Sequence, residues 1–71
     1  MSMVNAIREE VGSIIDAAPT GLGTAQIAER CATTQHSSRV RHAAEYLASI
    51  GKAWFDPATA RWFSQPRLIN H

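Results

Sequence analysis

The sequence of 71 residues has little of several features that mark larger or more specialised proteins. Its single cysteine, Cys31, excludes an intrachain disulfide. No apolar run approaches the roughly 18 residues of a membrane span, and the first residues lack the basic and apolar segments of a secretion signal. We therefore expect a cytoplasmic protein with no membrane partner.

The patterns of a catalytic or metal site are also missing. Glu9 and Glu10 are adjacent, and adjacent side chains on a helix point about 100° apart, so we expect both to be solvated rather than paired as acid and base. The segment PTGLG lacks the lysine and the spacing of a phosphate-binding loop. Cys31 and the three histidines match no familiar zinc spacing. Because a chain this short also buries little surface, we expect neither an enzyme nor a bound cofactor.

Charge is scarce and unevenly distributed. Charged residues make up 18% of the chain, and the net charge is only +1 at pH 7, which is low for a protein that binds nucleic acid. Residues 1–29 contain one basic and four acidic side chains, whereas residues 30–71 contain six basic and two acidic ones. The second part of the chain is therefore where an anionic partner is expected to bind.

A first helix is predicted over about residues 3–18, because apolar residues recur there three and four positions apart. Ser2 is the expected N-cap. The buried stripe would consist of Val4, Ile7, Val11, Ile14, Ile15 and Ala18. The segment PTGLG then breaks the helix, and we expect it to turn the chain and to insert Leu22 into the core.

A second, shorter helix is predicted over about residues 24–31. Thr24 is placed to accept a hydrogen bond from a backbone N–H of the first turn, as an N-cap. The inward face would consist of Ile27, Ala28 and Cys31. We expect Cys31 to act as a small buried hydrophobe rather than as a redox group.

The third predicted helix, over about residues 35–50, has two different faces. The core side would consist of Val40, Ala43, Ala44, Leu47 and Ile50, and Gly51 follows where a left-handed cap residue is wanted. The polar side would consist of Ser38, Arg41, His42 and Glu45, with Gln35, Ser37 and Arg39 at its margins. Hydroxyl, imidazole and guanidinium groups near the start of a helix are groups that can contact base edges in DNA.

A β-hairpin is predicted over about residues 52–64, KAWFDPATARWFS. Two aromatic runs flank the turn DPAT, in which the proline occupies the position whose φ it already satisfies. Strand alternation directs Ala53 and Phe55 toward the helices. The pattern leaves open whether Trp62 or Phe63 points inward.

The tail, residues 65–71, contains the apolar pair Leu68 and Ile69. Such a pair either folds back on the domain or docks on a second subunit. Together with the small core, it suggests a homodimer.

The run of residues 24–55, TAQIAERCATTQHSSRVRHAAEYLASIGKAWF, resembles the bacterial winged helix-turn-helix pattern. The framework positions of that pattern are occupied by Ile27, Val40, Leu47 and Gly51. The turn Ala32-Thr33-Thr34 is about two residues longer than the commonest version and lacks its glycine. The resemblance implies one mainly α domain over residues 1–71, with three helices, a C-terminal hairpin as the wing and a short extended segment before the second helix that pairs with the wing.

The same resemblance implies binding to double-stranded DNA, as a small transcriptional regulator or an accessory DNA-binding factor. The recognition helix would contact DNA through Gln35, Ser37, Ser38, Arg39, Arg41 and His42, and the turn and wing through Thr33, Thr34, Lys52 and Arg61. Arg41 is the leading candidate for a base contact, because a bidentate arginine to guanine is the commonest specific pairing. Helix capping by the hydroxyl residues and plain surface exposure of the arginines are the alternatives.

A winged helix that serves as a protein-interaction module without DNA binding is the competing hypothesis. The near-neutral net charge, Glu45 on the polar side of the third helix and the chance of exposed tryptophans favour it. Salt dependence separates the two, because phosphate contacts weaken steeply as salt rises.

Overall fold

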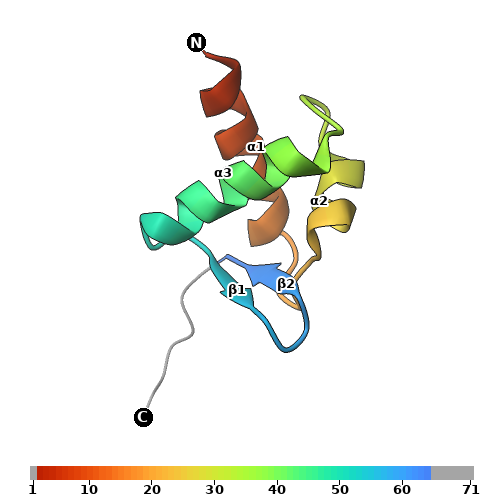
Figure 1. Ribbon diagram of the computed structural model, residues 1–71, viewed down its shortest axis with the longest axis vertical. Helices are drawn as coiled ribbons and strands as arrows, with labels where there is room; N and C mark the ends of the chain where they lie inside the picture. The colour runs from red at the N-terminus through yellow and green to blue at the C-terminus, as the bar shows by residue number, and fades with distance from the viewer. Residues whose placement is uncertain (1, 65–71) are drawn as a thin grey trace.

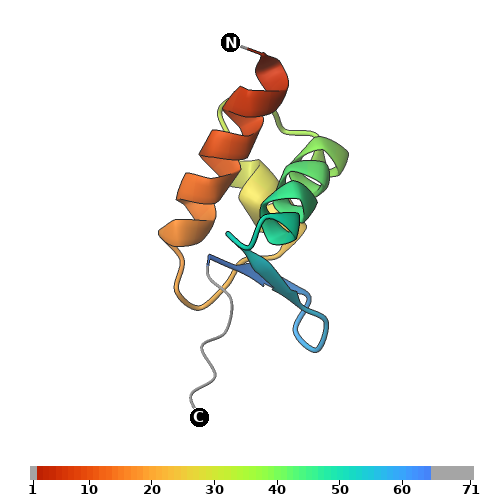
Figure 2. The ribbon, with the colours of Figure 1, turned by 90° about the vertical axis from the view of Figure 1, so that its left-hand side faces the viewer.

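Three helices followed by a two-stranded hairpin make up the part of the chain that the structure, a computed structural model, describes, which is residues 2–64. The elements are α1 (Met3–Asp16), α2 (Thr24–Arg30), α3 (Ser37–Ser49), β1 (Trp54–Asp56) and β2 (Arg61–Phe63). The helices pack on one another, and the hairpin lies across one end of them (Figures 1 and 2). This confirms the prediction of a mainly helical fold with a small β-hairpin. Within residues 2–64, none of the helices has both the length and the apolar character needed to cross a membrane.

Helix α1 begins as predicted and ends two residues early. Ser2 caps it, since its hydroxyl accepts a hydrogen bond from the Asn5 backbone N–H at 3.2 Å. Ile7, Val11 and Ile15 are buried, but the prediction that Val4 belongs to the core is wrong, because its side chain is 54% exposed. The first turns of α1 project beyond the other helices (Figure 1), and Val4 lines an open groove between α1 and α3 that leaves this end of the stripe partly uncovered.

Helix α2 is capped differently from the prediction. Gly23, not Thr24, is the N-cap residue, and its backbone N–H donates to the Gln26 side-chain oxygen at 2.9 Å. Thr24 is the first helical residue, and its hydroxyl accepts a hydrogen bond from the indole N–H of Trp62 at 3.0 Å. The threonine therefore joins α2 to the hairpin.

Helix α3 is two residues shorter at its start than predicted and ends in the predicted manner. Gly51 has a φ of +80°, its N–H donates to the Ala48 carbonyl, and the Lys52 N–H donates to the Leu47 carbonyl at 2.8 Å. This pair of bonds is a Schellman cap. The prediction that Ile50 is buried is wrong: it follows the last helical residue, borders an open groove and is 46% exposed.

The hydrophobic core fills the space between the three helices and the inner face of the hairpin. Its largest fully buried side chains are Val11, Ile15, Ile27 and Val40, and Leu22, Cys31, Leu47, Ala53 and Trp62 pack with them. Leu22 is in the core as predicted, and so is Cys31. Burial is the main cause of the raised pKa of the Cys31 thiol, followed by the nearby Glu10 carboxylate, and both disfavour the thiolate.

The hairpin register settles which aromatic residue points inward. Trp54 pairs with Phe63, and Phe55 pairs with Trp62. Trp62 is 5% exposed and lies in the core, and the Phe55 ring contacts it with centroids 4.8 Å apart. Phe55 therefore shares the inner face, as predicted, but it lies at the edge and is 40% exposed. On the other face Trp54 stacks on Phe63.

A short extended segment before α2 adds to this hairpin. The backbones of Leu22 and Trp62 exchange two hydrogen bonds, of 3.1 and 2.7 Å, in an isolated antiparallel bridge. Gly21 makes the bridge possible, because its φ is +85° and a Cβ there would lie 2.6 Å from Cζ of Phe63. The few extended residues expected before α2 are thus present.

Candidate nucleic-acid interface

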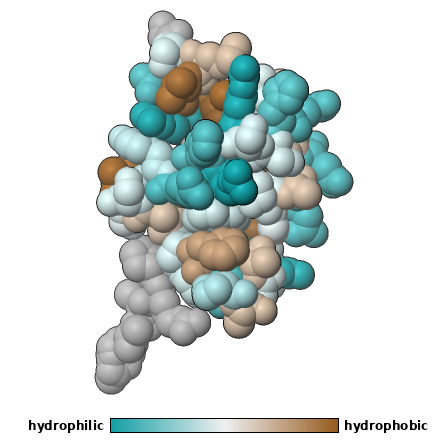
Figure 3. Space-filling view, in the orientation of Figure 1, coloured by the Kyte–Doolittle hydropathy of each residue, from teal (hydrophilic) through white to brown (hydrophobic). Residues whose placement is uncertain are grey.

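The first two turns of α3 present a row of polar side chains to solvent. Ser37, Ser38, Arg39, Arg41 and His42 are all exposed, and we call this set the α3 polar face. The opposite side of the same turns is anchored in the core by Val40, Ala43 and Ala44. Hydrophilic surface accordingly covers the middle of the molecule, where α3 crosses the view (Figure 3). The two-faced helix predicted from the sequence is present, with the polar side chains uncovered.

The turn that leads into α3 is held by a carboxylate on α1. The Glu10 side chain accepts hydrogen bonds from the backbone N–H groups of Ala32, at 2.6 Å, and Thr33, at 2.9 Å. The bond from Ala32, followed by those from Thr33, lowers the pKa of Glu10, because both favour the charged carboxylate. The expectation that Glu10 is merely solvated is therefore wrong. Glu10 ties the first residues of this turn, which has no glycine, to α1.

Thr34 lies inside this turn rather than on the surface. It is 7% exposed, and its hydroxyl accepts a hydrogen bond from the His36 backbone N–H at 3.2 Å. This bond is a local turn contact, because His36 is itself the N-cap residue and no side chain caps α3. The burial of Thr34 removes it from the predicted DNA contacts. Thr33 and Gln35 remain exposed beside the α3 polar face.

Three further basic residues were predicted to contact DNA, namely Arg39, Arg61 and Lys52, and each has different neighbours in the structure. Arg39 donates from Nη1 to the Met3 sulfur at 3.3 Å. Arg61 donates to the carbonyls of Thr20 and Gly21, both at 3.3 Å, so its guanidinium lies against the turn before α2. Lys52 is exposed, but the 13-residue α3 separates it by about 20 Å from the start of the helix. The structure therefore does not bring Lys52 to the rest of the set.

The hairpin turn lies on the same side of the molecule as the start of α3 in both views (Figures 1 and 2). The Asp56 side chain accepts from the Ala58 N–H at 3.0 Å and from the Thr59 hydroxyl, and its carbonyl accepts from the Ala60 N–H at 2.7 Å. Ala60 has a φ of +57°, a left-handed conformation that closes the loop into β2. The turn predicted from DPAT is present, and its local bonds hold it in one shape below α3 in these views.

A cation–π pair between α1 and α3 was not predicted. The Arg8 guanidinium lies over the Tyr46 ring, 3.6 Å from its centroid. No sequence signal indicates it, because the pairing depends on how the two helices cross. The pair holds the Arg8 guanidinium against Tyr46.

Groups that could hold a metal ion are absent from the part of the chain that the structure describes: no three His, Cys, Asp or Glu side chains come together there. His71 and the apolar pair Leu68 and Ile69 lie outside the described residues. Comparisons with protein-family models, curated proteins and solved structures find no match to this chain. Function is therefore inferred from the geometry of the α3 polar face and the hairpin.

Proposed function

We propose that this chain is a winged-helix protein that binds double-stranded DNA and acts as a small transcriptional regulator or an accessory DNA-binding factor. The observation that carries the proposal is the α3 polar face, in which Ser38, Arg41 and His42 are exposed while Val40 and Ala44 beneath them are completely buried. An exposed helix held in this way fits the B-DNA major groove, which is about 12 Å wide. The three helices, the hairpin and the Leu22 bridge are the parts that a winged helix requires.

Charge along α3 favours its N-terminal half as the contact surface. Arg39 and Arg41 lie in the first two turns, and Glu45 is the first acidic residue of the helix. The positive end of the helix dipole and the first-turn backbone N–H groups also suit phosphate oxygens. In this arrangement the start of α3 approaches the DNA, while Glu45 lies farther from the phosphates.

Different roles follow for the members of the α3 polar face. Arg41, near its centre, would donate to guanine O6 and N7, a contact worth about 1–3 kcal/mol of discrimination. Ser37 and Ser38, at the helix start, would donate to phosphate oxygens, and Thr33 and Gln35 extend that edge. Residues of the hairpin turn would contact the neighbouring backbone as the wing.

The proposal is tested by fluorescence anisotropy of labelled duplexes at several salt concentrations. We expect retention at low salt and a log–log slope of roughly −0.9 for each phosphate contact. Arg41→Lys keeps the charge but not the bidentate geometry, so it should reduce sequence preference more than it reduces affinity for random duplex. A chain that retains no duplex at low salt would contradict the proposal.

A winged helix that binds another protein instead of DNA is the second candidate. The observation that favours it is the number of large apolar side chains left in solvent, which are Met3, Val4, Tyr46, Ile50 and Phe55. The net charge of +1 points the same way. The anisotropy experiment separates the two, because a protein-interaction module gives no DNA signal at any salt concentration.

A further inference from the structure

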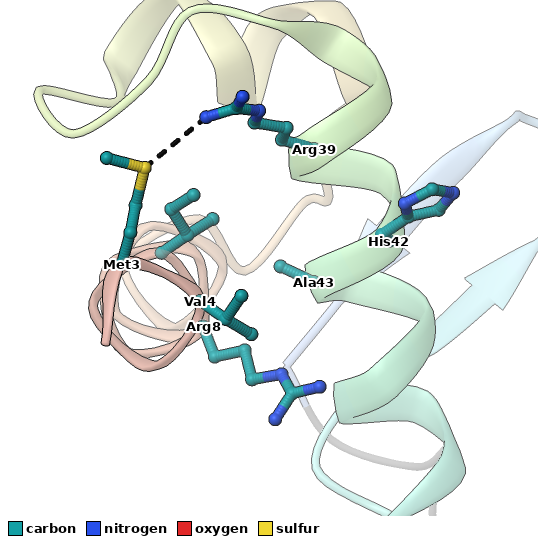
Figure 4. A pocket seen from close by; sticks show the side chains of 7 residues that line it. Met3, Val4, Arg8, Arg39, His42 and Ala43 are labelled. Carbon is teal, nitrogen blue, oxygen red and sulfur yellow. Dashed lines mark hydrogen bonds between the residues drawn. The ribbon is translucent and has the colours of Figure 1, made fainter. Parts of the chain in front are cut away.

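A groove runs between the first turns of α1 and the first half of α3, outside the centre of the α3 polar face. It has a volume of about 360 Å³ and is lined by Met3, Val4, Ile7, Arg8, Arg39, His42 and Ala43. Figure 4 shows Val4 and Ala43 facing each other across it, while the His42 ring leaves α3 on the side away from α1. Small-molecule sites typically occupy about 300–1,000 Å³ and have mainly apolar walls. The groove is therefore large enough for a compact ligand.

The charges around this groove have one sign. Arg39 and Arg8 project into it at opposite ends, with the apolar walls between them (Figure 4). None of the lining residues, all of them within the described part of the chain, is acidic. The neighbouring groove farther along α1, by contrast, has a mixed lining, in which Glu9 and Asp16 balance Arg8 and Lys52. Charge complementarity thus favours an anion in the first groove more than in the second.

At one end of the groove, the Arg39 guanidinium donates to a weak hydrogen-bond acceptor. Its Nη1 donates to the Met3 sulfur at 3.3 Å, and a thioether is a poor hydrogen-bond acceptor. A carboxylate in the same place would form a charge-assisted bond, which is roughly twice as strong as a neutral one. Arg8, in contrast, is stacked on Tyr46. It contributes positive potential to the groove rather than a pair of hydrogen-bond donors for a carboxylate. The geometry thus favours a carboxylate at the Arg39 end.

The exposed apolar surface in the groove can contact the apolar part of such a ligand. Val4 is 54% exposed, and Met3 is similarly uncovered. Apolar surface is visible at this end of the molecule, flanked by hydrophilic side chains (Figure 3). A ring laid on Met3 and Val4 would remove this surface from water.

We infer that this groove binds a compact apolar carboxylic acid, with its ring or short chain against Met3 and Val4 and its carboxylate accepting hydrogen bonds from Arg39. The groove shares Arg39 and His42 with the α3 polar face. The inference nevertheless differs from the proposed DNA binding, because it concerns a ligand of a different class and its test contains no DNA.

The test is a titration of the whole ¹⁵N-labelled chain with 2-naphthoate in the absence of DNA, followed by amide chemical shifts. We expect saturable shifts at the start of α1 and the first half of α3, with a Kd on the order of 1 mM for a ligand of this size. The neutral analogue 2-naphthalenemethanol is the matched control and should bind about tenfold more weakly, because it lacks the charge that Arg39 recognises. Equal binding of the alcohol, shifts centred on the hairpin, or no saturable shifts would each overturn the inference.

Two variants locate the ligand within the groove. Arg39→Gln should weaken naphthoate binding about tenfold and leave the binding of the alcohol unchanged. Val4→Ser should weaken both ligands severalfold, whereas Ile50→Ser, which changes an equally exposed apolar residue at the other end of α3, should weaken neither. Parental naphthoate affinity in Arg39→Gln would overturn the assignment. Because no DNA is present, failure here leaves the DNA-binding proposal as it was, and failure to bind DNA leaves this site as it was.

Discussion

Glu10 is the side chain that most directly connects the scaffold to the proposed DNA-binding helix. Its carboxylate receives two backbone N–H groups from the turn that precedes α3, and that turn also buries Thr34. Its partners lie 22 and 23 residues away in sequence, so no local pattern could indicate them. A carboxylate that accepts backbone N–H groups across such a distance ties the α2–α3 turn to α1.

We predict that Glu10→Gln lowers the free energy of unfolding by about 1 kcal/mol at pH 7, because an amide replaces one of the two carboxylate acceptors with a donor. The pKa of Glu10 is lowered in the folded chain, so its ionised form stabilises the fold above the usual glutamate pKa, and this contribution is lost as the pH falls through the folded-state pKa. The difference between parent and variant should therefore shrink below about pH 4. Urea unfolding at pH 7 and pH 3 measures it.

The control for this prediction is Glu9→Gln, which removes the same charge from an exposed neighbouring position. We expect it to change the free energy of unfolding by less than about 0.5 kcal/mol. Equal effects of the two substitutions would show that the hydrogen bonds from Ala32 and Thr33 contribute nothing.

At the scale of the elements, the sequence predicted what depends on periodicity and missed what depends on tertiary contact. The three helices, the hairpin turn and the Gly51 cap were predictable because each has a local signal. Val4 and Ile50 follow the apolar period of their helices, yet both are exposed because each lines an open groove between α1 and α3 instead of packing closely against the neighbouring helix. The inward orientation of Trp62 required the register of the hairpin, which the local pattern does not contain.

The candidate DNA-binding site also combines features with a local sequence signal and features that depend on tertiary contact. The exposed members of the α3 polar face could be predicted from helical angle alone, since the opposite side of the helix had to be apolar. The burial of Thr34, the contacts of Arg61 with the Thr20 and Gly21 carbonyls and the distance of Lys52 could not, because each depends on how separate elements pack. The α1–α3 groove has no local signal for the same reason.

Two glycines with positive φ provide a matched pair that tests how the turns are built. Gly21→Ala should lower the free energy of unfolding by about 2–4 kcal/mol, since it adds both a left-handed penalty and a clash with the Phe63 ring. Gly51→Ala should cost only about 1–2 kcal/mol, because nothing lies within 4 Å of the new Cβ. Thermal unfolding of both variants measures the difference. Equal losses would contradict a specific contact between Gly21 and Phe63.

The whole molecule combines a small core with an uneven charge distribution. Most acidic residues precede residue 30 and most basic residues follow it. The net charge of +1 is therefore the sum of an acidic first part and a basic second part of the chain. A core this small leaves several large apolar side chains in solvent, among them Tyr46 and Ile50. These features suit a domain that associates with a partner, with a second copy of itself or with both.

The homodimer suggested by the sequence stays a prediction about the whole molecule. We expect sedimentation velocity to give twice the mass of the chain at concentrations of about 100 µM, and a dimer would bind paired half-sites about one helical turn of DNA apart. A monomer that persists as the concentration is raised would contradict it. The measurement also bears on the DNA proposal, because a monomer binds one half-site.

The central claim is that the α3 polar face contacts double-stranded DNA, and one pair of variants tests it most directly. Arg41→Ala and Arg8→Gln each remove one positive charge, the first from the centre of that face and the second from α1, where Arg8 lies over Tyr46. In duplex-binding isotherms, with folding checked by circular dichroism, we predict that Arg41→Ala lowers affinity at least about fivefold. Arg8→Gln should stay within about twofold of the parent. Equal losses in the two variants, or parental affinity in Arg41→Ala, would contradict the account.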